Sequence, residues 1–359
     1  MDNRLVHYLC CPVTRSPLQL KTISFSKERP DQVEEGILFA SADWFYPVVG
    51  GIPRLQVEAF ADHEDFFRRH LPDYAARRRS LEEKFPGLIA YVRKKNGATK
   101  KSFALEWSLY SYEEDRTWAA GKQQLLARFL EETGEAAGRL TGKLVFDAGC
   151  GNGQLDSLIA AAGATVIAMD LSTSIDRAFR QNTHPDAWFI QGDVQYPPVI
   201  AGVFHIVQCS GVLHHTNNTE LSFSCLSPCV RPGGTYSVWL YQPRKDVLHN
   251  SFNLLRRVTS RLPARLTYIL LACTMLPVSL LWKRLKGKRQ NRREIMVELM
   301  DWFSPPFRRE HTTDEAASWY AKRGYQSITV TTEDIFGFNM IGKKAPVSSA
   351  IAPISSVHA

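Results

Sequence analysis

A short apolar run followed by alternating glycines constrains this 359-residue chain more than any other feature. Residues 144–147 have the character of a buried strand, and Gly149, Gly151 and Gly153 follow before a helix-like run over 154–162. Glycines between a strand and a helix let backbone approach a ligand at the helix N-terminus, where amide N–H groups are free. The G-x-G-x-G spacing differs from that of dinucleotide dehydrogenases and from the phosphate loop. The turn therefore predicts a nucleotide-type site without specifying the nucleotide.

Asp170 stands at the end of the second predicted strand, 164–169, about 20 residues after the glycines, where an acid usually holds a ribose. A carboxylate can accept hydrogen bonds from both ribose hydroxyls. A turn or helix-capping role is the alternative, because Ser172 and Thr173 follow. The position of Asp170 favours the binding role, with Leu171 beside it.

Three further predicted strands each lie next to a short motif. Strand 188–191 leads to G-D-V at 192–194, strand 204–209 leads to G-V-L-H-H at 211–215, and R-P-G-G at 231–234 turns into strand 235–241. With D-A-G-C-G-N-G and Asp170, these motifs make the run 143–241 similar to the class I S-adenosylmethionine-dependent methyltransferases. The resemblance implies an α/β fold: a Rossmann-like, seven-stranded sheet with helices on both faces. It also implies S-adenosylmethionine as the cofactor.

The resemblance further implies which residues bind that cofactor. The three glycines would approach its amino-acid end, and Asp147 would hydrogen-bond around the same end, directly or through water. Asp170 would hold the ribose, Asp193 would bind adenine N6, and the amide of Val194 would bind adenine N1. For Asp193 a simple turn role competes, since Gly-Asp pairs are common in turns. The predicted cofactor-binding residues are Asp147, Gly149, Gly151, Gly153, Asp170, Leu171, Asp193 and Val194.

Two histidines, His214 and His215, follow the fourth strand, near the place where the methyl group should emerge. Histidine can accept a proton from a hydroxyl or amine near neutral pH. A structural role is the alternative for both, because not every methyl transfer needs a base. Tyr241, Glu106 and His311 are weaker candidates for the same role.

Residues 1–55 resemble a zinc-ribbon-like family that includes the activator subunit of tRNA methyltransferases. The family pattern is L-x-C-P-x-C-x-x-P-L, followed by a cysteine pair just before Y-P-I-x-x-G-I-P. Only Cys11 occupies a ligand position here, while Thr14, Phe39 and Ala42 stand at the other three. A structural zinc site needs four good ligands, so we predict no metal and a small domain held by apolar packing.

The next two segments lead into the core. Residues 56–100 are expected to form a charged helical linker with solvated faces, and 101–241 the first part of the methyltransferase core. Within it, 103–118 gathers aromatic and acidic residues, among them Trp107 and Trp118. Packing of these aromatics onto the sheet and direct contact with a ligand are both consistent with the sequence.

The basic charge of the chain lies mainly in one insert, 242–300. The formal net charge is +8, and the insert holds thirteen lysines and arginines against three acids. Residues 266–282 carry no charge, but they are short for a membrane span and contain Pro277. A helical hairpin that covers the active site is expected first. Peripheral contact of 250–290 with an anionic membrane is the further option.

The core should resume at 301–344, with strands over 325–331 and 338–343 and a disordered tail at 345–359. The leading function is methyl transfer to an oxygen or nitrogen of a small or carrier-linked, including lipid-linked, molecule. An RNA methyltransferase is the alternative, although no N-P-P-Y-type motif follows strand four, so a nucleic-acid partner is not favoured. A non-catalytic binding or scaffold protein is the second alternative. The absence of an apolar N-terminal segment and an odd number of cysteines, seven, predict a cytoplasmic protein with reduced thiols.

Overall fold

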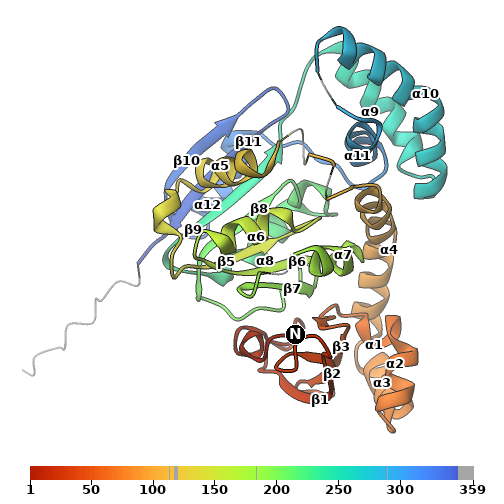
Figure 1. Cartoon of the computed structure of the whole chain (residues 1–359), viewed down its shortest axis with the longest axis vertical. Coiled ribbons are helices and arrows are strands. Elements are labelled where there is room, and N and C mark those ends of the chain that lie inside the picture. Colours follow the sequence, from red (N-terminus) through yellow and green to blue (C-terminus); the bar gives the residue numbers. More distant parts are fainter. Residues whose placement is uncertain (113, 117–119, 183, 289, 347–359) are drawn as a thin grey trace, which may run out of the picture.

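The computed structural model describes residues 1–346 except 113, 117–119, 183 and 289. Its centre is a seven-stranded sheet with the order β10-β11-β9-β8-β5-β6-β7 (Figure 1). The five strands from β9 to β7 in this order are parallel, and β11 lies antiparallel between β9 and β10. This topology confirms the predicted fold class. The strands are β5 (Leu144–Ala148), β6 (Thr165–Asp170), β7 (Ala187–Gln191), β8 (Phe204–Ser210), β9 (Val230–Tyr241), β10 (Tyr325–Glu333) and β11 (Gly337–Lys344).

Helices cover both faces of this sheet, so its central strands are almost continuously apolar. One face packs in a core that joins Phe129, Ile159 and Ala178 to strand residues such as Val166. The other face packs against residues such as Trp319 in a second core. The covering helices are α5 (Lys122–Thr133), α6 (Gln154–Ala161) and α7 (Ser174–Gln181) on the first face, and α8 (Thr219–Leu226) and α12 (Thr313–Ala321) on the second. Short 3₁₀ turns are η2 (Ala137–Arg139), η3 (Leu213–His215) and η4 (Ser227–Cys229).

One local expectation was wrong. The R-P-G-G motif at 231–234 is not a turn before the fifth strand but part of β9, which begins at Val230. Pairing with β8 shifts in register there, between Phe204 and Ile206, and Gly233 has a φ of +73°. A glycine can take this left-handed conformation without the penalty that a Cβ brings, so the irregularity is absorbed within the strand.

The N-terminal residues form a four-stranded antiparallel sheet with the order β1-β2-β3-β4, which lies beside β7 (Figure 1). Backbone hydrogen bonds join the two, from Leu55 N to the carbonyl of Gln191 and from Cys10 N to that of Pro198. Cys11 is buried, with its sulfur 3.2 Å from the hydroxyl of Tyr46. The zinc-ribbon-like resemblance of this part stays a prediction. Its elements are η1 (Asn3–Tyr8), β1 (Gln19–Phe25), β2 (Val33–Phe39), β3 (Phe45–Val49) and β4 (Ile52–Pro53).

Helices connect this N-terminal sheet to the core. The boundary expected between residues 100 and 101 falls inside one continuous helix, α4, so the linker and the aromatic segment are not separate elements. The buried stripe of α4, from Ile89 to Glu106, also shows that the segment is not a solvated linker throughout. The four helices are α1 (Ala59–Asp62), α2 (Glu64–His70), α3 (Tyr74–Lys84) and α4 (Pro86–Ser108).

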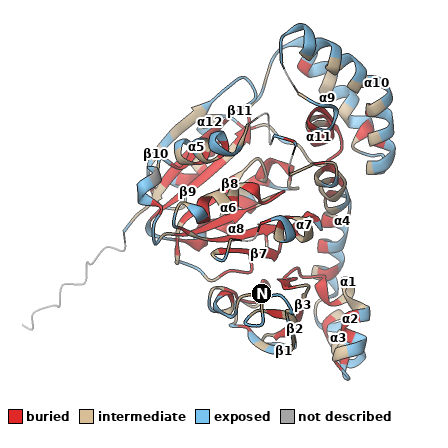
Figure 2. Cartoon of the chain, in the orientation of Figure 1, coloured by how far each residue is buried: buried red, intermediate tan, exposed pale blue. Residues whose placement is uncertain are grey.

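The insert consists of three helices, α9 (Val247–Thr259), α10 (Ala264–Leu285) and α11 (Arg292–Phe303). A small core joins α10 and α11 through residues such as Leu271, Met300 and Phe303, with Leu105 of α4 packed against it. Figure 2 shows α11 largely buried, whereas α9 and α10 are mostly exposed. Trp118 of the aromatic segment and most of the predicted disordered tail, 347–359, lie outside the described residues.

Candidate active site

A cavity of about 1620 Å³ opens at the carboxyl ends of β5, β6, β8 and β9. This is the edge at which doubly wound sheets bind ligands. The other walls come from α4 and from the insert. The volume exceeds the range of about 300 to 1,000 Å³ that is usual for one small ligand, so a cofactor and an acceptor can be held together.

All three glycines of the turn after β5 have a positive φ, a conformation that glycine adopts without steric penalty. Gly149, Gly151 and Gly153 have φ values of +114°, +56° and +70°. A Cβ at Gly149 would lie 2.2 Å from a methyl carbon of Val212, and one at Gly151 would lie 2.7 Å from the ring of Trp107. The turn is therefore packed against two other segments, which fixes the path of its backbone along the cavity.

Asp170 lies at the end of β6 and lines the cavity. One of its oxygens accepts from the amide of Gly151 at 3.1 Å, and the other accepts from the amide and hydroxyl of Ser172 and the hydroxyl of Ser174. Burial raises the pKa of Asp170, and these hydrogen bonds oppose the increase. Asp170 thus links the glycine turn to the β6 loop, which is the local structural role weighed from the sequence, and its role in binding the ribose stays a prediction.

Asp147 is buried in the cavity wall at the end of β5. Burial raises its pKa to about 7, a hydrogen bond with Asp156 lowers it, and the charges of Asp170 and Glu132 raise it. A cationic group placed beside Asp147 would favour its ionised form. The methionine ammonium of the predicted cofactor is such a group.

Asp193 also lines the cavity, and α4 supplies its partners. Lys95 Nζ lies 2.6 Å from its carboxylate, the side-chain amide of Asn96 donates to the same oxygen at 3.1 Å, and the amide of Gln195 donates to the other. Leu171 and Val194 line the cavity nearby. Lys95 and Asn96 were not predicted as site residues, because the sequence of their segment indicates a charged linker.

Residues 146–238 match the family model described as "Methyltransferase domain". This part of the chain is therefore similar to a methyltransferase domain. An uncharacterized methyltransferase of Synechocystis sp. is 30% identical over 112 residues, which are 28% of this chain and 52% of that protein. A ubiquinone biosynthesis O-methyltransferase of Aromatoleum aromaticum is 33% identical over 99 residues, 26% of this chain and 42% of that protein. The chain thus spans about half the length of these relatives.

Solved structures similar to the chain include methyltransferases that act on different molecules. The magnesium protoporphyrin IX methyltransferase of Synechocystis, solved with bound S-adenosylhomocysteine, has a TM-score of 0.42 and 16% identity, covering 70% of this chain and all of that one. The 1,6-didemethyltoxoflavin-N1-methyltransferase of Burkholderia thailandensis has a TM-score of 0.42 and 13% identity, covering 69% and 88%.

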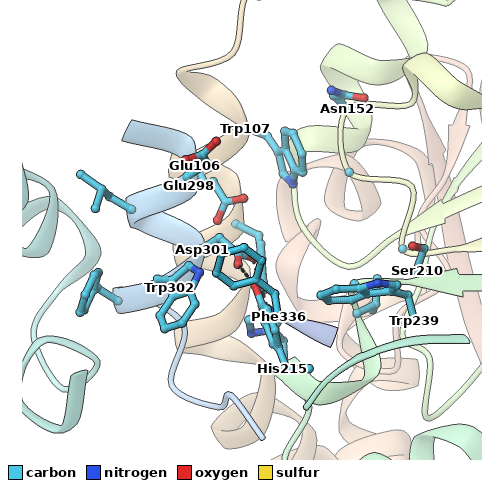
Figure 3. Close-up of a pocket in the computed structure, with 18 of the residues that line it drawn as sticks. Glu106, Trp107, Asn152, Ser210, His215, Trp239, Glu298, Asp301, Trp302 and Phe336 are labelled. Carbon is cyan, nitrogen blue, oxygen red and sulfur yellow. Dashed lines mark hydrogen bonds and ion pairs between the residues drawn. The ribbon is translucent and has the colours of Figure 1, made fainter. Parts of the chain in front are cut away.

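Beyond the cofactor end of the methyltransferase domain, the cavity is walled by aromatic side chains, which we call the aromatic chamber. They come from α4, β9, α11 and the loop before β11, elements that are far apart in sequence (Figure 3). An acceptor in such a chamber would be held by apolar contact and stacking. The chamber residues are Phe103, Trp107, Trp239, Tyr241, Trp302 and Phe336.

His215 lines the cavity, but its ring nitrogens face other protein groups. Nδ1 lies 3.0 Å from the carbonyl oxygen of Phe307, and Nε2 lies 3.2 Å from Oδ1 of Asp301. Although burial opposes it, His215, Tyr241 and Arg308 hold the pKa of Asp301 below its ordinary value. Both ring nitrogens of His215 therefore lie beside protein groups, a carbonyl on one side and a carboxylate on the other.

His214, the other predicted catalytic base, is not among the described residues that line the cavity. Its side chain is fully buried, and the centroid of its ring lies 4.3 Å from that of the Tyr241 ring. Burial lowers the pKa of His214 well below its ordinary value, and neighbouring His215 lowers it further. The pair His214-His215 therefore supports the wall of the aromatic chamber. His311 also has a protein partner, since its Nε2 lies 2.9 Å from the hydroxyl of Thr219.

The residues around the cavity fit S-adenosylmethionine. Asp147, Asp170 and Asp193 line it together with the glycine turn, which matches a ligand with an amino-acid end, a ribose and an adenine. Asp147 would receive the ammonium, Asp170 the ribose hydroxyls and Asp193 the adenine. When bound, the cofactor supplies a methyl group on a positively charged sulfur. The chain itself supplies orientation and a chamber with apolar walls, from which much of the rate of a displacement can come.

Proposed function

We propose that the protein transfers a methyl group from S-adenosylmethionine to an oxygen or nitrogen of a small or lipid-linked acceptor. The observation that carries this proposal is that the glycine turn and three acids share one cavity with the aromatic chamber. A non-catalytic scaffold would not need a cofactor site that is continuous with a second space large enough for an acceptor.

Calorimetric titration with S-adenosylmethionine tests the cofactor part of this proposal. We expect binding by the intact protein and about tenfold weaker binding by Asp170→Asn, because a carboxylate accepts roughly 1 to 1.5 kcal/mol more strongly than a neutral amide. Asp314→Asn, which changes an exposed acid at the start of α12, is the control and should bind normally. Absence of binding at about 1 mM, the upper end of common KM values, would remove the proposal.

The outer face of the insert suggests where the acceptor comes from. Of the described residues between 247 and 293, none is acidic, whereas basic side chains lie at both ends of α10. α10 is long and apolar enough to cross a membrane by length and composition alone, with a mean hydropathy of 1.7, and only 11% of that window is buried. The exposed large apolar side chains of α9, α10 and the turn between them are Val247, Leu248, Leu254, Leu255, Val258, Leu262, Leu266, Ile269, Leu270, Val278, Leu281, Trp282 and Leu285.

We propose that this apolar and basic face rests on an anionic membrane surface. Apolar side chains would enter the headgroup region, and each basic side chain near the surface adds about 1 kcal/mol of attraction. Three of the exposed residues, Leu248, Val278 and Trp282, also line the cavity. The mouth of the cavity would thus open on the membrane, which suits an acceptor that carries a lipid chain.

Co-sedimentation with vesicles of anionic phosphatidylglycerol tests the membrane contact. The intact protein should pellet with these vesicles and not with neutral phosphatidylcholine, and the double variant Leu266→Glu, Ile269→Glu should stay in solution. Phe25→Glu changes an equally exposed apolar residue on the N-terminal sheet and should pellet normally. Failure of the intact protein to pellet, or binding to RNA in place of vesicles, would contradict the proposal.

A further inference from the structure

Glu106 is a buried carboxyl group in the wall of the cavity. Its side chain has no solvent exposure, and neither oxygen has a hydrogen-bond partner among the described residues. A buried polar group without a partner loses its hydration and gains no hydrogen bond in return, which destabilises the protein. Such a group calls for an explanation, and a ligand in the cavity is the simplest one, because Glu106 lines that cavity (Figure 3).

The setting of Glu106 on α4 supports this explanation. Asn96, Thr99, Ser102 and Glu106 follow one another at helical spacing along the buried side of α4. Asn96 donates to Asp193, and the hydroxyl of Ser102 lies 2.7 Å from that of Ser304 on the segment after α11. These two polar side chains meet protein partners, whereas Glu106, at the end that reaches the chamber, meets the cavity.

Charged groups approach α4 from several elements. Asp301 of α11 and Asp170 of β6 act on Glu106 directly, and burial together with these two charges raises its pKa well above the ordinary value. The other charges near this end of α4 have partners of their own. Glu298 of α11 pairs with Lys283 of α10, and Arg177 of α7 donates to the carbonyls of Trp107 and Ser108. These surroundings favour the protonated form of Glu106 in the free protein.

We propose that Glu106 is a catalytic residue that takes the proton from the hydroxyl or amine of the methyl acceptor. The inference rests on the proposed function. In the step, the acceptor oxygen or nitrogen forms a bond to the methyl carbon, and the carbon–sulfur bond breaks with its electron pair remaining on sulfur. The proton of the acceptor passes to the Glu106 carboxylate, so the positive charge of the donor and the negative charge of Glu106 disappear together.

The positive charge of the methyl donor allows Glu106 to lose its proton before the step and to take up the proton of the acceptor during it. A positive sulfur in the cavity favours the carboxylate, so binding of S-adenosylmethionine should release the Glu106 proton. S-Adenosylhomocysteine is neutral at sulfur, and with it Glu106 should stay protonated. Both ligands carry the same amino-acid end, so any response of Asp147 is common to both. The difference between the two ligands reports on a group near the sulfur.

The test counts protons by calorimetric titration of the intact protein in two buffers of different ionisation enthalpy. We expect S-adenosylmethionine to release about one proton more than S-adenosylhomocysteine. By linkage, the affinity for S-adenosylmethionine relative to that for S-adenosylhomocysteine should rise about tenfold per pH unit near neutrality. Glu106→Gln should abolish both differences, because an amide cannot release the proton.

Glu298→Gln is the matched control, since Glu298 also lines the cavity but pairs with Lys283. It should keep the difference in proton release. Equal proton counts for the two ligands in the intact protein would overturn the role of Glu106, even if Glu106→Gln did not fold. A difference that persists in Glu106→Gln would overturn it as well. If neither ligand binds the intact protein, the proposed function fails instead.

Discussion

Gly149→Ala is expected to weaken the binding of S-adenosylmethionine about 100-fold. Gly149 has a φ of +114°, and an added Cβ would lie 2.2 Å from Cγ2 and 2.9 Å from Cγ1 of Val212. A strained backbone and an overpacked contact each cost about 1 to 3 kcal/mol, and about 3 kcal/mol corresponds to a 100-fold change in affinity. The turn would relieve the clash by shifting, and with it would move the backbone that faces the cavity. Calorimetric titration of the variant measures the loss.

Gly142→Ala separates this effect from backbone strain alone. Gly142 has a φ of +73° in the turn before β5, but nothing lies within 4 Å of an added Cβ. The control should lose stability in thermal unfolding and still bind S-adenosylmethionine with normal affinity. Normal affinity of Gly149→Ala would show that the glycine is needed only for packing, and that the turn does not determine the cofactor site.

The parallel core was predictable because its signals are local. The strands β5, β7 and β8 are short apolar runs that are each followed directly by a glycine, and β6 ends at Asp170. In a parallel sheet these ends meet at one edge, so residues from separate strands could be placed together without knowing any contact. The approach fails where the pattern is irregular, as in β9, whose glycines lie within the strand.

The wall of the cavity that α4 forms could not be predicted, because the sequence pattern of α4 is misleading. Lys95 and Asn96 belong to a stretch rich in lysine, which reads as a solvated helix. Glu106 lies on the buried side of α4, where pattern rules expect an apolar residue. Only the packing of α4 between the sheet and the insert shows that these polar side chains face a cavity. His215 lines the cavity, but its two partners, Phe307 and Asp301, are about 90 residues away and could not be found from the sequence around it.

The N-terminal sheet raises a separate question, because it shares one hydrophobic core with the methyltransferase domain. Leu9, Cys11 and Leu55 belong to the same cluster as Ile190 and Val199. Two arginines also cross this junction. Arg54 is nearly buried and pairs with Asp176 of α7, while Arg4 is mostly exposed and lies near Asp186. A docked but independent module would tolerate the loss of either one.

Arg54→Ala should instead destabilise the whole protein by about 2 kcal/mol, in the range for the loss of hydrogen bonds to a charged group, because Arg54 is buried whereas Asp176 keeps some exposure to solvent. Arg54 donates to Asp176, to the side chain of Gln191 at 3.2 Å and to the carbonyl of Val49, so the substitution leaves buried acceptors unpaired. Urea unfolding measures the change. Arg4→Ala removes an exposed pair and should cost about 1 kcal/mol or less. Equal, small effects of both substitutions would show that the N-terminal sheet is only attached to the domain. A single cooperative unfolding transition at a much lower urea concentration for Arg54→Ala would show that the sheet and the domain fold as one unit.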